Sequence, residues 1–267
     1  MACLSIQETI KLNPLKFIHI KLLLHLVWET AVVKDMVKEI IQNLNRELPA
    51  TVKLVAVSKF HPFEAIEEAY EAGQRIFAES RPQELLSKVR RLEELRAERG
   101  QDYMADVQWH FIGHLQTNKL KMVLPYVSLV QSVDSVRLLD SVEAWAAANG
   151  KVVSVLLEPH VAAEETKQGF AAEEIYEILE AATQDEKYQH ICFRGIMGMA
   201  TFTDDESVVR ADFEALRGIF DECRQHFPSL APDFTELSIG MSDDYPLAIS
   251  YGSTMVRIGS MIFGERL

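Results

Sequence analysis

The sequence predicts an α/β protein built as a single (β/α)8 TIM barrel. Eight apolar, strand-like runs alternate with helix-like runs between Val52 and Gly259, and this alternation is typical of parallel sheets covered by helices. No Pro- or Ser-rich linker divides these units. A doubly wound open sheet is the alternative, but its Gly-rich loop is missing after the first predicted strand. The barrel is therefore the preferred fold class.

The predicted strands are short, apolar and bounded by turn residues, and they cover residues 52–59, 76–79, 107–112, 128–133, 151–157, 193–199, 236–240 and 255–259. The helices between them are amphipathic and cover residues 64–72, 84–98, 116–123, 135–148, 171–182, 207–226 and 244–250. Ser135 is the expected N-cap of its helix, and Asn149 with Gly150 the expected stop. Much of the charge on helix 84–98 is interpreted as a solvated face.

The composition indicates a protein of ordinary globular type with an acidic surface. Apolar residues make up 48% and charged residues 25% of the 267 residues. A net charge of −13 argues against nucleic acid and anionic membrane surfaces as partners, because both would repel it. Cys3, Cys192 and Cys223 are scattered and lack metal-binding spacing, which favours reduced thiols in a cytoplasmic protein and no metal site.

The first 33 residues form an N-terminal extension, and residues 34–267 form the predicted barrel domain. The apolar segment 17–28 is too short and too interrupted to span a bilayer. A second apolar pattern at helical spacing predicts a leading helix from about Asp35 to Arg46. Two interpretations of the extension stay open: a start site assigned too far upstream, or an additional helix.

Lys59 ends the first predicted strand and is the first candidate functional residue. Side chains alternate along a strand, so Val55, Val57 and Lys59 share one face. If this face lines the barrel, the valines fill the core and the amine lies at its mouth. Partial desolvation there lowers a lysine pKa and favours the nucleophilic amine, as a Schiff-base lysine requires. The alternative is an ordinary lysine that reaches water at a strand end.

The last two strands offer a candidate anion site. Phosphate is often bound in such barrels by the loops after strands seven and eight. Ser242 follows strand seven at the start of a helix, and Gly259 with Ser260 follows strand eight. Small residues let backbone N–H groups approach an anion closely. The alternative is that Ser242, with Asp243 and Asp244, only caps the helix.

Arg257 lies within the last strand, which a parallel barrel buries on both faces. A buried guanidinium without an acceptor costs several kcal/mol, roughly, so a partner is expected. Either a structural carboxylate or an acceptor on a ligand would satisfy it.

Four motifs in this order resemble the pyridoxal 5′-phosphate (PLP) homeostasis family, single-domain relatives of the alanine racemase N-terminal barrel. They are Ala56-Val57-Ser58-Lys59, the run Trp109-His110-Phe111-Ile112-Gly113-His114-Leu115-Gln116-Thr117-Asn118-Lys119, Gly240-Met241-Ser242-Asp243-Asp244 and Gly252-Ser253-Thr254-Met255-Val256-Arg257-Ile258-Gly259. The resemblance implies that Lys59 forms the aldimine with PLP and that Ser242, Gly259 and Ser260 hold its phosphate. It also implies that Arg257 faces the pyridine nitrogen.

Two positions depart from the family pattern. Ser80 stands where the family usually has an asparagine behind the cofactor, and His160 stands where it usually has another asparagine. These departures weaken the expectation for the walls of the site. His110 and His114 do not predict a metal site, because four residues along a strand separate them by roughly 13 Å.

Three functions stay open at this point. The first is a protein of vitamin B6 homeostasis, expected to be a monomer, that holds PLP on Lys59 without robust turnover and hands it to PLP-requiring apoenzymes. The second is a PLP-dependent amino-acid racemase, which needs acid/base groups on both faces of the cofactor. The third is an aldolase-like enzyme that uses Lys59 on a sugar phosphate, and it leaves Arg257 without a purpose. The visible absorption of bound PLP would separate the first two from the third.

Overall fold

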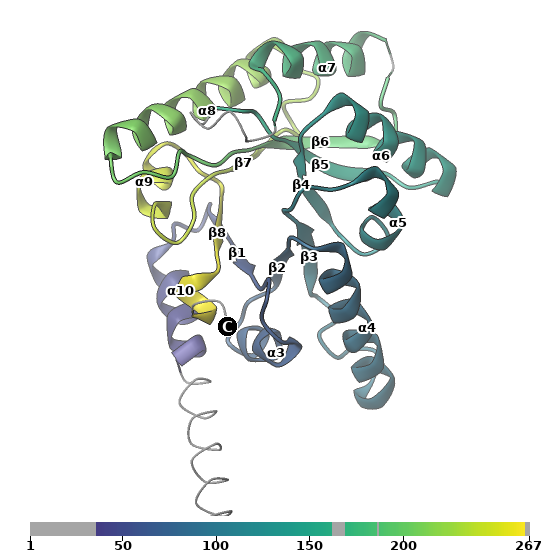
Figure 1. The fold of residues 1–267 in the computed structure, drawn as a ribbon, viewed down its shortest axis with the longest axis vertical. Helices are drawn as coiled ribbons and strands as arrows, with labels where there is room; N and C mark the ends of the chain where they lie inside the picture. Colours follow the sequence, from purple (N-terminus) through teal and green to yellow (C-terminus); the bar gives the residue numbers. More distant parts are fainter. Residues whose placement is uncertain (1–35, 162–168, 186, 265–267) are drawn as a thin grey trace, which may run out of the picture.

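The fold is a closed barrel of eight parallel strands with helices around it, as the sequence predicts (Figure 1). The computed structural model describes residues 36–161, 169–185 and 187–264. Each strand pairs with its neighbours in chain order, and β8 closes the ring against β1. No helix in these ranges is long and apolar enough to cross a membrane.

The strands lie close to their predicted positions. They are β1 Lys53–Val57, β2 Ile76–Glu79, β3 Gln108–Phe111, β4 Leu129–Val133, β5 Val153–Leu157, β6 Ile191–Met197, β7 Glu236–Ser238 and β8 Met255–Ile258. The largest difference is in β6, which begins and ends two residues before the predicted strand.

The helices that follow the strands are α3 Phe63–Glu71, α4 Pro82–Arg99, α5 Leu120–Val123, α6 Val136–Asn149, α7 Ala172–Gln184, α8 Glu206–His226, α9 Tyr245–Ser250 and α10 Ser260–Phe263. The predicted helix 116–123 is wrong in its first half, where a 3-10 turn, η1 Thr117–Lys119, leads into α5. The short helix α10 has no counterpart in the sequence prediction.

Local signals explain where several elements begin and end. The Ser135 hydroxyl accepts a hydrogen bond from the Leu138 N–H at the start of α6, and Gly150 ends that helix in the left-handed conformation with φ 61°. Residues 36–47 are helical, with Val37, Ile41 and Leu44 buried at helical spacing. This agrees with the predicted leading helix, while Asp35 and the extension 1–33 lie outside the described residues.

The core has an outer and an inner layer, as a barrel requires. The outer cluster joins strand residues such as Leu54 and Ala56 to the helices. The inner cluster consists of Val55, Val57, Ala78, Leu129, Leu156, Met197 and Met255. Alternate residues of β1 therefore face opposite layers, and the predicted shared face of Val55 and Val57 is the inner one.

Candidate functional site

A cavity of about 300 Å³ opens at the carboxyl ends of the strands, the end that carries the active sites of such barrels. The five site residues predicted from the sequence all line it, although they come from three separate segments of the chain, after β1, after β7 and in and after β8. These are Lys59, Ser242, Arg257, Gly259 and Ser260. Sequence-distant residues meet there because parallel strands direct their carboxyl ends to one mouth.

Lys59 follows β1 and is supported by a buried polar network. The backbone N–H of Ser58 donates to the carbonyl of Ala78 at 3.1 Å, and the Ser58 hydroxyl donates to Glu79 Oε1 at 2.6 Å. The next residue, Phe60, has a positive φ of 69° and donates its backbone N–H to Glu84. Hydrogen bonds on both sides of Lys59 therefore fix the backbone that carries its amine.

The centre of this network is the ammonium of Lys88 on α4. Its Nζ lies 2.6 Å from Glu79 Oε1, 2.7 Å from the Ser58 carbonyl oxygen and 3.0 Å from Glu84 Oε1. Lys88 is 5% exposed and Glu79 is fully buried. Burial raises the pKa of Glu79, while the charge of Lys88 opposes this shift. Lys88 is therefore not part of the solvated face expected for much of the charge on helix 84–98.

The second polar region of the cavity contains the two serines. Ser260 Oγ and Ser242 Oγ, from the turns after β8 and β7, lie 3.1 Å apart. Gly240 has φ +94°, and a Cβ there would come within 2.6 Å of the Ala248 Cβ. A Cβ on Gly259 would come within 3.1 Å of the Val57 carbonyl oxygen. Both turns are therefore tightly packed and place two hydroxyl groups together at the cavity.

Within the described residues, no side-chain hydrogen bond to α9 supports the capping alternative for this turn. Asp244 is the N-cap residue of α9 but makes no side-chain hydrogen bond to that helix. Its Oδ1 accepts the backbone N–H of Met241 instead and so closes the turn. Burial raises the pKa of Asp244, and the positive charge of Arg257 opposes that shift. Ser242 does not cap the helix; its hydroxyl meets Ser260.

Arg257 is held by uncharged acceptors. Its Nη1 donates to the carbonyl and hydroxyl oxygens of Ser238, both at 2.7 Å, and its Nη2 donates to the Gly198 carbonyl at 2.9 Å. The side chain is 4% exposed, and burial lowers its pKa to about 10. No carboxylate within the described ranges forms an ion pair with it, so the structural carboxylate expected as one alternative is wrong. A guanidinium that forms no ion pair with the described residues therefore lines the cavity, and the charges of Glu158 and Asp244 act on it from a greater distance.

Of the two departures from the family pattern and the two histidines considered for a metal site, only Ser80 lies at this cavity. Ser80 lines the cavity, so the departure from the family pattern lies at the site itself. His160 Nδ1 is buried without a hydrogen-bond partner in the described structure. His110 and His114 contact different partners, since His110 bonds Gln131 and His114 Nδ1 lies 2.8 Å from Asp134 Oδ2. They do not form a common site.

Two ionisable groups near the cavity were missed by the sequence reasoning. Glu158 follows β5, and burial together with the charge of Asp134 raises its pKa to about 7. His61 lines the cavity beside Lys59, and burial followed by the charge of Lys88 lowers its pKa. Both follow strand ends, so their position could have drawn attention to them, whereas their shifted pKa values depend on tertiary neighbours.

Comparison with known proteins identifies the family. The family model of the alanine racemase N-terminal domain matches residues 33–267. The pyridoxal phosphate homeostasis protein of Haemophilus influenzae is 37% identical over 216 residues, which cover 81% of this chain and 86% of that protein. The human protein of the same name is 37% identical over 241 residues, covering 88% of this chain and 84% of its own.

Solved structures agree with this assignment. PipY of Synechococcus elongatus PCC7942 with PLP bound is 33% identical with a TM-score of 0.74, covering 85% of this chain and 100% of PipY. Alanine racemase from Clostridium difficile shares the fold with a TM-score of 0.63, but only 14% of the sequence, and 56% of that longer chain is covered. Its likeness therefore concerns the fold alone. The chain belongs to the pyridoxal phosphate homeostasis protein family, on a (β/α)8 barrel of the alanine racemase N-terminal type.

Proposed function

We propose that this protein binds PLP in the Lys59 cavity and serves PLP homeostasis, holding the cofactor covalently and releasing it without robust catalytic turnover. The observation that carries this proposal is the meeting of an amine, a hydroxyl pair and a buried guanidinium around one cavity of about 300 Å³. That PipY, a relative 33% identical over its full length, holds PLP supports the same conclusion.

The residues present fit the three polar groups of PLP. Lys59 supplies a primary amine, the group that bonds reversibly to an aldehyde. Ser242 and Ser260 supply hydroxyl donors for a phosphate, and the tight glycine turns beside them leave backbone N–H groups close to the cavity. Arg257 supplies a donor for a pyridine nitrogen. A cavity of about 300 Å³ is at the lower end of the range for small-molecule sites.

Arg257 is the residue that favours a carrier over a catalyst. When bound, PLP supplies an electrophilic aldehyde and a ring that can withdraw electrons, most effectively with a protonated ring nitrogen. A guanidinium only donates hydrogen bonds, so Arg257 stabilises the unprotonated nitrogen. The uncharged acceptors that hold Arg257 leave its positive charge in place, which disfavours a second proton nearby. The site is therefore suited to retention of PLP more than to turnover of amino acids.

Reduction with borohydride tests the covalent site. The purified protein is incubated with PLP, reduced, digested and examined by mass spectrometry. We expect the adduct on Lys59, and its loss in Lys59→Ala, with weak non-covalent PLP binding retained. Lys119→Ala, which alters a lysine in η1 outside the cavity lining, is the matched control and should keep the adduct. An adduct on Lys53 or Lys119 in the wild type would refute the assignment.

The partners follow from this function. We propose that the recipients of PLP are apoenzymes that require it, and that the protein acts as a cytoplasmic monomer. The net charge of −13 supports the choice of protein recipients over nucleic acid or anionic membranes. Transfer from the loaded protein to an apoenzyme, measured as recovered enzyme activity faster than with an equal amount of free PLP, would support direct delivery. Equal rates would contradict it.

A further inference from the structure

A chain of buried polar side chains crosses the barrel interior beneath Arg257. The interior of such barrels is normally filled by apolar side chains. Here Ser238 of β7 and Gln131 of β4 are both fully buried, and His110 of β3 is 4% exposed. Ser238 Oγ lies 2.8 Å from Gln131 Oε1, and Gln131 Nε2 lies 2.9 Å from His110 Nδ1. The chain thus links Arg257 to the other end of the barrel.

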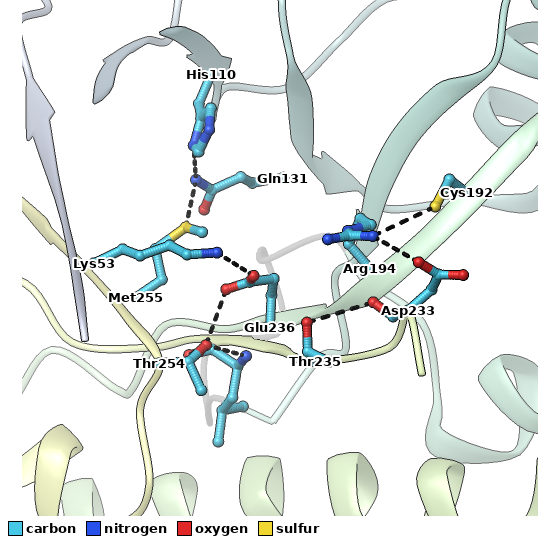
Figure 2. A network of polar contacts seen from close by, with 11 residues as sticks. Lys53, His110, Gln131, Cys192, Arg194, Asp233, Thr235, Glu236, Thr254 and Met255 are labelled. Carbon is cyan, nitrogen blue, oxygen red and sulfur yellow. Dashed lines mark hydrogen bonds and ion pairs between the residues drawn. The ribbon is translucent and has the colours of Figure 1, made fainter. Parts of the chain in front are cut away.

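His110 ends the chain at the amino mouth. With Lys53, Gln108, Arg194 and Glu236 it lines a cavity of about 390 Å³ at the start of the strands. Figure 2 shows the His110 ring above Gln131, whose amide nitrogen also lies 3.2 Å from the Met255 sulfur. Lys53 and Glu236 form an ion pair on the wall of this cavity.

The orientation of the Gln131 amide sets the direction of donation along this chain, since its Nε2 lies 3.2 Å from the Met255 sulfur and its Oε1 lies 2.8 Å from Ser238 Oγ. Arg257 can only donate, so the Ser238 hydroxyl accepts from it and directs its own proton to Gln131 Oε1. In this orientation the NH₂ group of Gln131 faces His110 Nδ1. His110 therefore accepts at Nδ1 and carries its proton on Nε2.

The environment of His110 agrees with this neutral form. Burial, followed by the charge of Lys53, lowers the pKa of His110 to about 3. The ring therefore stays uncharged at neutral pH, which leaves Nδ1 free to accept. Its Nε2 makes no hydrogen bond to any residue in the described ranges, and the ring borders the amino-mouth cavity.

We propose that Gln131 is a positioning residue for Arg257: through the Ser238 hydroxyl it fixes the guanidinium at the cofactor cavity, and the same chain fixes His110 as the Nε2–H tautomer at the opposite mouth. The part that concerns the cofactor rests on the proposed function. The part that concerns the tautomer does not, because it depends only on side chains of the unliganded protein.

The first experiment reads the tautomer directly in the unliganded protein. Nitrogen-15 spectra of the eight histidines, with His110 assigned by its loss in His110→Phe, should show a protonated Nε2 and an unprotonated Nδ1 from pH 8 to pH 5. In Gln131→Glu a carboxylate oxygen faces Nδ1, so we expect Nδ1 to become protonated. A protonated Nδ1 in the wild type, or a wild-type ring that titrates near pH 6, would overturn the proposal.

The second experiment reads the effect on Arg257 through PLP titration. Gln131→Leu should bind PLP about fivefold more weakly, the equivalent of one neutral hydrogen bond. Ser238→Ala breaks the next link and should have the same effect, so a misfolded Gln131→Leu does not remove the test. Ser132→Ala is the matched control, because Ser132 is a buried residue of β4 that bonds the Gly113 carbonyl instead.

The outcomes separate the two proposals. Unchanged PLP affinity in both Gln131→Leu and Ser238→Ala would refute the positioning role while PLP binding by the wild type stands. If the wild type does not bind PLP, the proposed function fails, and the His110 tautomer still decides whether the chain has the inferred direction. A shift of the His110 resonances on addition of PLP, lost in Ser238→Ala, would be direct support.

Discussion

Replacement of Lys88 by methionine should lower the free energy of unfolding more than replacement of any charged residue on the surface. The ammonium of Lys88 contacts Glu79, Glu84 and the Ser58 carbonyl within 3.0 Å. In Lys88→Met the fully buried carboxylate of Glu79 loses its cation, and one of its oxygens, Oε2, already has no hydrogen-bond partner in the described structure. Breaking a buried ion pair from one side costs about 3–5 kcal/mol.

This loss of free energy corresponds to a decrease in melting temperature. For a domain of this size 1 kcal/mol corresponds to about 2–4 °C, so we expect a decrease of about 6–20 °C by calorimetry at pH 8. Arg91→Met, which removes an exposed ion pair with Glu94 on the same helix, is the control. It should leave the melting temperature essentially unchanged, because exposed pairs contribute little.

The loss of stability in Lys88→Met should depend on pH, with a sign that follows from the pKa of Glu79. Burial raises the pKa of Glu79 in the folded state above its unfolded value, so ionised Glu79 costs stability, and this cost grows as pH rises from the unfolded to the folded pKa. Loss of Lys88 removes the cation that opposes this rise in the pKa of Glu79. The difference between Lys88→Met and wild type should therefore shrink at pH 5, and Lys88→Met/Glu79→Gln should recover stability at pH 8. A loss of stability below about 1 kcal/mol in Lys88→Met, or an equal loss at pH 5 and pH 8, would refute this role of Lys88.

Four further predictions follow from the same structure. Ser242→Ala/Ser260→Ala should weaken PLP binding by about 1–3 kcal/mol, and unchanged affinity in a PLP titration would place the phosphate elsewhere. Wild type should exchange the α-proton of alanine slowly in deuterated water, and folded, PLP-loaded Arg257→Glu should be faster; rapid wild-type exchange would restore the racemase function. Burial raises the pKa of Glu158 to about 7, so ionisation of Glu158 destabilises the folded protein as pH rises from about 4.5 to 7. The melting temperature of Glu158→Gln should therefore fall less over that range than that of the wild type. An equal slope in both proteins would contradict this. Deletion of residues 1–33, outside the described ranges, should leave the melting temperature and PLP binding nearly unchanged, and a decrease of several degrees would show that the segment packs on the barrel.

The sequence by itself determined the repeating pattern and the chemistry of the cavity. Eight strands with helices between them specify a barrel because each parallel strand needs a crossover helix before the next. In a barrel, residues just after the strands meet at one mouth. Lys59, Ser242 and Ser260 could therefore be grouped without coordinates, although their separation in the chain is large.

Only the tertiary structure decided which polar groups are buried and what they contact. Lys88 belongs to a helix with charges on several sides, and its sequence pattern does not distinguish the one lysine that points inward. Strands of a parallel barrel are apolar on both faces, so alternation groups residues without telling the inner face from the outer one. The contacts of Gln131 with Ser238 and His110, and the uncharged acceptors around Arg257, join strands that are distant in sequence. Those contacts exist only once the barrel has closed.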